Sequence, residues 1–197
     1  MSGELFAIKT AKANKMSVNE VQALGSLWVL SGQCPNVIRY YHSWIEEGEL
    51  FLVMEYCQNT LQKEITKYRQ SGQSIPEKTI ISYLRSALLG LASIHRQGIL
   101  HLDVKPENML FKGNVLKIAD FGLSRAAQLK TGDFDEGDSR YLAKEVLNIN
   151  PSIDLTKADI FSLAMTAYEM LTLEVLPNNG EDWLQVRETG LRLSGRM

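Results

Sequence analysis

The fold of this 197-residue chain is decided by one short stretch, His101-Leu102-Asp103-Val104-Lys105-Pro106-Glu107-Asn108. It carries a carboxylate (Asp103), a cation (Lys105) and a side-chain amide (Asn108). Phosphoryl transfer uses a carboxylate that orients the attacking hydroxyl and accepts its proton, a cation near the transferred phosphate, and an oxygen ligand for magnesium. The alternative is a polar loop that contains these residue types by chance, because short motifs have many false positives. The segments on either side decide between the two interpretations.

A second acidic motif, Asp120-Phe121-Gly122, follows this stretch. Between the two motifs the sequence predicts strands over 109–111 and 115–119, joined by a hairpin turn at Gly113-Asn114. A carboxylate directly after the second strand faces back toward the first motif, where it can bridge magnesium to the phosphates of ATP. Such a tripeptide alone is more often an ordinary turn, but the two motifs at this spacing favour phosphoryl transfer.

A third motif lies upstream, where Phe6-Ala7-Ile8-Lys9 is a short apolar run that ends in a lysine. Alone, such a lysine is more often a solvated strand end. Its position before the other two motifs favours a lysine that pairs with the α- and β-phosphates of ATP and is held by a glutamate on the next helix. Glu20 is the candidate for that glutamate, and an exposed glutamate on a helix surface is the equally weighted alternative.

The rest of the chain predicts an α+β fold. Strand signals occur at 5–8, 37–41 and 50–56, and residues 18–30 have apolar side chains at helical intervals. A long helix is predicted to have Pro76 at its first position and to stop at Gly98. Its expected apolar stripe consists of Ile80, Ile81, Leu84, Leu88, Leu91 and Ile94. A second long helix is predicted with Thr156 as its N-cap. A small β-rich part is thus followed by a larger helical part, with a hinge near 55–59.

The composition is that of an ordinary soluble domain, with 45% apolar and 22% charged residues. The net charge of -2 provides no basic field, so we expect no nucleic-acid partner. Its two cysteines match no disulfide framework or zinc spacing, which favours a reducing compartment. The apolar runs are too short to cross a bilayer, and no signal peptide is recognisable. We therefore expect the protein in the nucleus or cytoplasm.

The three motifs in this order resemble the catalytic domain of eukaryotic protein kinases, and the resemblance covers essentially the whole chain. Finer features resemble the Wee/Myt family of mitosis-inhibitory kinases. These features are the segments Arg39–Glu46, His101–Pro106, Glu136–Glu145, Lys157–Leu163 and Leu176–Trp183. The resemblance implies a bilobal protein-kinase-like fold, with residues 1–57 as a partial small lobe and 58–197 as a partial large lobe. The Gly-rich loop that precedes the lysine strand in kinases is missing, as are the last helices of the large lobe, so we expect a kinase domain truncated at both ends.

The resemblance also implies ATP and Mg²⁺ as cofactors and assigns further residues to their site. Asp103, Lys105 and Asn108 are expected to be catalytic, and Asn108 and Asp120 to hold the metal. For ATP, the expected contacts beyond Lys9 and Glu20 are the adenine sandwich of Ala7 and Leu110, the gatekeeper Met54, the Glu55 carbonyl and the Cys57 amide. His101 is expected to lie beneath Phe121, and neither His42 nor His95 has an assignable role.

The implied reaction is inhibitory tyrosine phosphorylation of a cyclin-dependent kinase in cell-cycle control. Two alternatives stay open. One is a catalytically impaired pseudokinase or binding module, since the Gly-rich loop is missing. The other is a general Ser/Thr kinase, because Lys105 stands two residues after Asp103 as it does in that group. Leu102 replaces an arginine that binds an activation-loop phosphate in many kinases, so we expect activity without phosphorylation of that loop.

Overall fold

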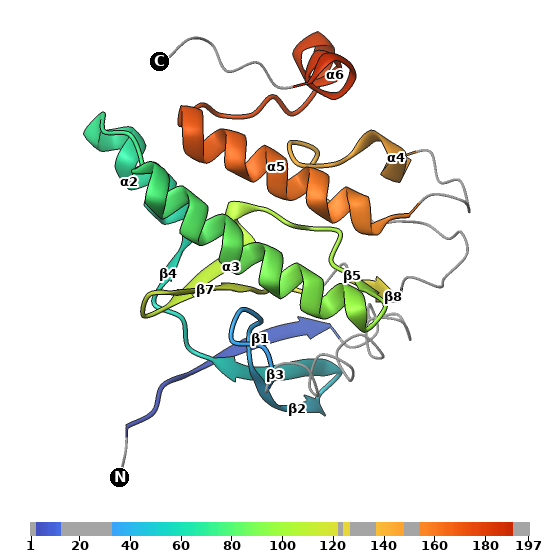
Figure 1. Ribbon diagram of the computed structural model, residues 1–197. Coiled ribbons are helices and arrows are strands. Elements are labelled where there is room, and N and C mark those ends of the chain that lie inside the picture. Colours follow the sequence, from blue (N-terminus) through green and yellow to red (C-terminus); the bar gives the residue numbers. More distant parts are fainter. Residues whose placement is uncertain (1–2, 13–32, 122–123, 127–136, 148–153, 191–197) are drawn as a thin grey trace.

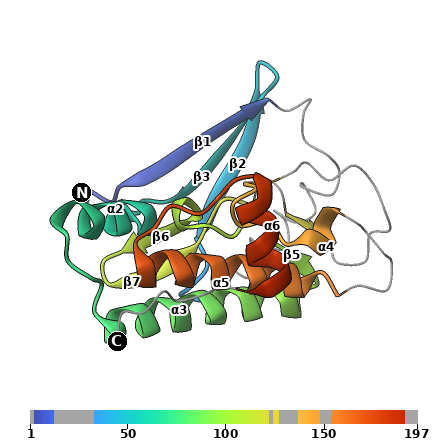
Figure 2. The same ribbon diagram turned by 90° about the horizontal axis from the view of Figure 1, so that it is seen from above.

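A three-stranded antiparallel sheet forms the N-terminal part of the fold. The computed structural model describes residues 3–12, 33–121, 124–126, 137–147 and 154–190. The strands lie in the order β1-β3-β2, with β1 at Phe6–Lys12, β2 at Tyr40–Glu46 and β3 at Glu49–Glu55. Figure 2 shows this sheet projecting from one side of the helical part. The predicted first and third strands are confirmed.

The predicted strand at 37–41 is displaced, because β2 begins only at Tyr40. Its first residues pair with the other part of the molecule instead. Val37 forms an isolated parallel bridge with Ile118, the Ile38 amide donates to the Ile118 carbonyl (2.9 Å) and the Ile118 amide donates to the Asn36 carbonyl (2.8 Å). The segment 36–38 therefore belongs to the large part of the fold, although β2 belongs to the small sheet.

The chain crosses from β3 to the larger part through residues 56–58, which we call the hinge. Two helices follow it, α2 at Leu61–Ser71 and α3 at Glu77–Arg96. The short strand β4 (Asn59–Thr60) precedes both helices. Further short strands and a 3₁₀ turn follow them: β5 (Ile99–Leu100), η2 (Pro106–Asn108), β6 (Met109–Lys112), β7 (Val115–Ile118) and β8 (Arg125–Ala126). Three helices end the described part: α4 (Lys144–Leu147), α5 (Thr156–Thr172) and α6 (Gly180–Thr189). The predicted hairpin around Gly113 is confirmed as β6 and β7.

Helix α3 packs against β7 and against α5, and in Figure 1 it lies between the two. Its buried face runs through Ile80, Ala87, Gly90, Leu91 and Ile94. The prediction that Ile81 and Leu88 belong to this stripe is wrong, because they are 55% and 47% exposed. They lie seven residues apart on the neighbouring face of the helix, which the described residues leave uncovered.

The predicted start of α3 is off by one residue and the predicted cap of α5 is wrong. Pro76 lies at the N-cap of α3, and the helix begins at Glu77. Thr156 is the first residue of α5, and the Asp154 carboxylate accepts hydrogen bonds from its amide (3.1 Å) and its hydroxyl (2.6 Å). A carboxylate at this position satisfies a backbone donor that the helix itself cannot.

Two predicted features fall outside the described residues: the helix at 18–30, which carries Glu20, and the glycine of Asp120-Phe121-Gly122. Glu136, the first residue of the Wee-like segment Glu136–Glu145, lies outside them as well. Within the described part, no helix is long and apolar enough to cross a membrane.

Candidate active site

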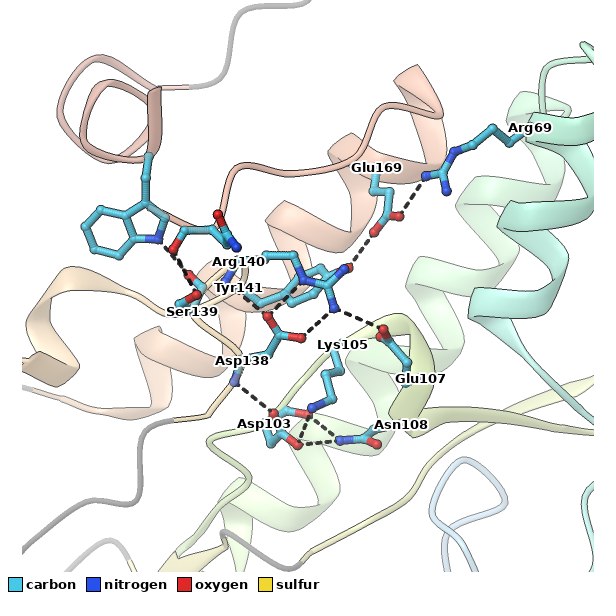
Figure 3. A network of polar contacts seen from close by, with 12 residues as sticks. Arg69, Asp103, Lys105, Glu107, Asn108, Asp138, Ser139, Arg140, Tyr141 and Glu169 are labelled. Carbon is cyan, nitrogen blue, oxygen red and sulfur yellow. Dashed lines mark hydrogen bonds and ion pairs between the residues drawn. The ribbon is translucent and has the colours of Figure 1, made fainter. Parts of the chain in front are cut away.

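Two polar side chains of the first motif, those of Lys105 and Asn108, converge on the Asp103 carboxylate. The loop of residues 101–105, which we call the catalytic loop, lies between β5 and η2. The 3₁₀ turn at Pro106 brings Asn108 back to Asp103. The Asn108 side-chain amide donates to Asp103 Oδ2 (2.7 Å) and to the Asp103 carbonyl (2.9 Å), and Lys105 Nζ lies 2.9 Å from Asp103 Oδ2 (Figure 3). Asp103 is thus held in one orientation beside a cation. The NH₂ group of Asn108 faces Asp103, which leaves its amide oxygen as the atom able to bind a metal.

A buried carboxylate on α5 supports the backbone of this loop. Asp159 Oδ2 accepts from the His101 amide (2.9 Å) and Oδ1 from the Leu102 amide (2.8 Å), while His95 Nε2 lies 2.7 Å from Oδ2. Asp159 is fully buried, and Leu102 has a φ of 62°, in the left-handed region. For a leucine that conformation is strained, and the Asp159 carboxylate holds it by accepting from the Leu102 amide and from the amide before it. Sequence reasoning gave neither Asp159 nor His95 a role.

His101 packs against Phe121, as predicted, with ring centroids 4.8 Å apart. Its Nδ1 accepts from the Asp103 amide (3.2 Å), and its Nε2 lies 3.0 Å from the Ala119 carbonyl. These partners assign the proton of the neutral ring to Nε2, since Nδ1 is the acceptor. One imidazole therefore links the backbone of the catalytic loop to the residue that precedes Asp120.

The third motif reaches the second through an ion pair. The Lys9 ammonium on β1 pairs with the Asp120 carboxylate, although the two residues are 111 positions apart in the chain. Asp120 has a φ of 62°, which turns the backbone sharply after the hairpin. The predicted partner of Lys9, Glu20, lies outside the described residues, so that assignment stays a prediction.

The residues predicted to hold adenine lie on three strands and in the hinge. Ala7 and Met54 are direct neighbours in the register of β1 and β3, and Leu110 lies on β6. By strand alternation Ala7 and Lys9 share one face of the sheet. Glu55 is the last residue of β3, and Cys57 follows in the hinge. Burial, with a smaller effect of Glu55, raises the pKa of the Cys57 thiol to about 11, so it is not a nucleophile at neutral pH.

An arginine that sequence reasoning missed joins the segment 138–141 to the catalytic loop. Arg140 makes a bidentate pair with Asp138 (2.6 and 2.9 Å) and a second pair with Glu107 (3.1 Å), as Figure 3 shows. Burial alone would raise the pKa of Asp138, but the hydrogen bonds and charge of Arg140 outweigh it and hold the pKa below its ordinary value. Asp138 is therefore ionised beside the loop at neutral pH.

The neighbouring Tyr141 anchors the same segment to two helices. Its buried hydroxyl donates to Glu169 Oε2 on α5 (2.5 Å), and Arg69 of α2 pairs with Glu169 Oε1 (3.0 Å; Figure 3). Burial, followed by the Glu169 charge, raises the pKa of Tyr141 far above its ordinary value, so the hydroxyl stays a donor. The backbone of the segment is further held by Arg187 of α6, which donates to the carbonyls of Ser139, Arg140 and Leu142 (2.9, 3.1 and 2.8 Å).

This geometry agrees with the comparison to known families, since residues 1–191 match the protein kinase domain. The chain belongs to the protein kinase family. It is 37% identical over 197 residues to a probable protein kinase of Dictyostelium discoideum, covering 95% of this chain and 54% of that protein. It is 33% identical over 200 residues to a Wee1-like protein kinase of Arabidopsis thaliana (98% of this chain, 38% of that protein). It is 32% identical over 212 residues to Wee1-like protein kinase 1-B of Xenopus laevis (95% and 35%).

These matches confirm the predicted α+β kinase fold and the resemblance to Wee-type kinases. The chain spans about half or less of the length of these relatives. The residues present also fit the cofactors that the family implies. Magnesium in nucleotide sites takes one or two protein oxygens and keeps phosphate and water as its other ligands. Asn108 and Asp120 are such a pair, and the described residues contain no denser cluster of metal-binding side chains.

Proposed function

We propose that this chain is the catalytic part of an ATP- and magnesium-dependent protein kinase. The observation that carries the proposal is the polar centre around Asp103, where Lys105 and Asn108 fix the carboxylate. The Lys9–Asp120 pair adds to it, since it joins the small sheet to the end of the hairpin. Three separate motifs of the chain therefore contribute to one site, which a chance resemblance in a single loop would not produce.

Each residue of the centre has a role that its contacts support. Asp103 orients the hydroxyl of the protein substrate and accepts its proton, and Lys105 stabilises the charge on the transferred phosphoryl group. Asn108 and Asp120 hold magnesium, which neutralises charge on the phosphates of the nucleotide. Lys9 binds the α- and β-phosphates, and its pairing with Asp120 places its ammonium beside the carboxylate that holds magnesium.

The adenine of ATP binds between Ala7 and Leu110 in this proposal. Met54 borders it as the gatekeeper, and the Glu55 carbonyl and the Cys57 amide form its hinge hydrogen bonds. The half-buried thiol of Cys57, whose pKa is raised to about 11, is compatible with this site, because a base needs a close-packed and uncharged neighbour here.

The finer substrate assignment is tyrosine in a cyclin-dependent kinase, phosphorylated as an inhibitory signal in the cell cycle. The similarity to Wee1-like protein kinases supports it. The nucleus or the cytoplasm is the compartment that we propose. The Arg140 bridge and the Arg187 contacts order residues 138–142 without any phosphate, which supports activity that needs no phosphorylation of the activation loop.

Phosphate transfer from magnesium-ATP to a cyclin-dependent kinase tests the proposal, with Asp103→Asn and Asp120→Asn as inactive variants and Asp154→Asn as the matched control. Asp154 is exposed just before α5, where its carboxylate accepts from the Thr156 amide, and it lies outside the site. We expect transfer by the wild type and by Asp154→Asn, and loss in the other two variants. Equal background in all four proteins would favour a binding module. Phosphoserine or phosphothreonine as the only product would favour a general Ser/Thr kinase.

A further inference from the structure

A buried charge cluster lies where the small sheet joins the rest of the molecule. The Glu55 side chain is only 4% exposed, yet it is an acid at the end of β3. Its Oε1 lies 2.8 Å from Lys117 Nζ and accepts from the Arg39 amide at 2.8 Å, and its Oε2 lies 3.0 Å from Lys112 Nζ. We call these groups the hinge cluster. None of them belongs to the polar centre around Asp103.

The Glu55 carboxylate is ionised in this surrounding. Burial by itself would raise its pKa, but the hydrogen bonds from Lys117, the Arg39 amide and Lys112 outweigh burial and lower it. The Lys117 side chain is nearly buried at 10% exposure, whereas that of Lys112 is 46% exposed. A buried ion pair of this kind contributes little net stability compared with apolar side chains. Stability alone therefore does not explain why these charges are buried.

The cluster joins three segments that are far apart in the sequence. Glu55 precedes the hinge, both lysines come from the β6–β7 hairpin, and the Arg39 amide lies between the segment 36–38 and β2. Lys117 is also the direct neighbour of Leu110 across the hairpin. The Lys117 ammonium lies 3.4 Å from the Val37 carbonyl. The backbone amide of Gln58 donates to the Phe111 carbonyl (3.1 Å). The Glu55 carboxylate therefore connects the hinge, which carries the expected backbone contacts to adenine, with the hairpin that carries Leu110.

We propose that Glu55 is a positioning residue for the nucleotide, because its carboxylate ties the hinge to the β6–β7 hairpin. Its side chain points into the cluster, while its backbone and that of residue 57 make the proposed contacts to adenine. The distance between the hinge and Leu110 is fixed before the nucleotide arrives, which lowers the ordering cost of binding. The inference rests on the proposed function, since it assigns the nucleotide to this same site.

The test uses the double variant Glu55→Gln/Lys117→Met, with Lys157→Met as the matched control. The double variant removes both buried charges, so neither is left unpaired, and Lys112 is free to turn into water. Lys157 is 72% exposed at the start of α5, far along the chain from the hinge. Thermal melting checks that each variant is folded. Two properties are then measured: ADP affinity with magnesium by calorimetry, and amide hydrogen exchange at Gln58.

We expect the Kd of ADP to rise about tenfold in the double variant, and the Gln58 amide to exchange about tenfold faster. In kinase assays the KM for ATP should rise by the same factor while kcat stays within about twofold, because the Asp103 centre is untouched. Lys112→Met should change ADP affinity by less than about twofold, since Lys117 keeps the shorter contact. Lys157→Met should change nothing.

A folded double variant with unchanged ADP affinity and unchanged exchange at Gln58 would overturn the inference. A parallel loss of kcat and melting temperature, with KM unchanged, would overturn it too, because the cluster would then be merely structural. A wild-type chain that binds no ADP would reject the proposed function. In that case the exchange rate at Gln58 alone decides whether Glu55 ties the hinge to the hairpin.

Discussion

Replacing Asp159 by asparagine should damage both stability and catalysis, although the residue never touches a substrate. Its two oxygens accept hydrogen bonds from two consecutive backbone amides of the catalytic loop, those of His101 and Leu102, and Oδ2 also contacts His95. An asparagine has only one oxygen. Whichever way its amide is turned, an NH₂ group faces a backbone N–H, and at least one buried donor loses its acceptor.

The magnitude follows from these contacts. An unsatisfied buried N–H costs about 1–3 kcal/mol. The hydrogen bonds that remain are no longer charge-assisted, which removes roughly another 1 kcal/mol. The lower desolvation cost of a neutral amide offsets a small part, so we expect a loss of about 2–4 kcal/mol in the free energy of unfolding. The strained Leu102 should relax and displace Asp103, and a displacement near 1 Å lowers kcat by about a hundredfold.

Urea denaturation and steady-state kinetics measure the two effects, and Asp154→Asn is the matched control. Asp154 lies just before the same helix and accepts hydrogen bonds from Thr156, but it is exposed, and the side-chain oxygen of an asparagine can accept the same bonds. We expect the control to lose less than about 0.5 kcal/mol and to keep its kcat. If Asp159→Asn is no less stable and no less active than this control, the support that we assign to Asp159 is wrong.

Three further predictions test other parts of the fold. Gly90→Ala should destabilise the protein by about 1–2 kcal/mol net of helix propensity, since its Cβ would meet the Asn36 carbonyl oxygen at 2.7 Å; a more stable variant in denaturation would contradict this packing. Tyr141→Phe should lose about 1.5–3 kcal/mol and raise the KM for the protein substrate, because Glu169 loses a donor; unchanged values in both assays would reject the contact. The folded pKa of Asp138 lies below the unfolded one, so its stabilisation is complete above about pH 4 and is lost as the pH falls through the lowered value. The stability difference between wild type and Asp138→Asn should therefore shrink from pH 6 to pH 3, and a constant difference would count against the Arg140 pair.

The sequence predicted most where the polar residues of a motif lie in a stretch that also predicts its own strand, loop or hairpin. The three motifs occur in order on a strand, a loop and the end of a hairpin, which indicated that they share one region of the fold, and Lys9 of the first motif does pair with Asp120 of the last. The boundary between the lobes at residues 57 and 58 and the pairing of Lys9 with Glu20 stay predictions.

The supporting contacts could not be found in the same way. Asp159 lies 57 and 58 residues from the amides that it holds, and Arg187 lies 45 to 48 residues from its carbonyls. A helix pattern does not reveal such partners, because they depend on how α5 and α6 pack on the loops. One signal for Asp159 was present in the sequence, a carboxylate in the first turn of a largely apolar helix. By itself, such a carboxylate is expected on the surface. Similarly, β-branched residues at 37–38 predicted a sheet strand, but their backbone pairs with β7.

The central claim is that Asp103 and Asp120 form a phosphoryl-transfer site with Lys9. Transfer of labelled phosphate from magnesium-ATP to a purified cyclin-dependent kinase tests it most directly, with wild type, Asp103→Asn and Asp120→Asn compared at equal concentration. We predict label on tyrosine with the wild type only, and a loss of at least about a hundredfold in either variant. Equal labelling by all three proteins, or none by the wild type under saturating ATP, would contradict the claim.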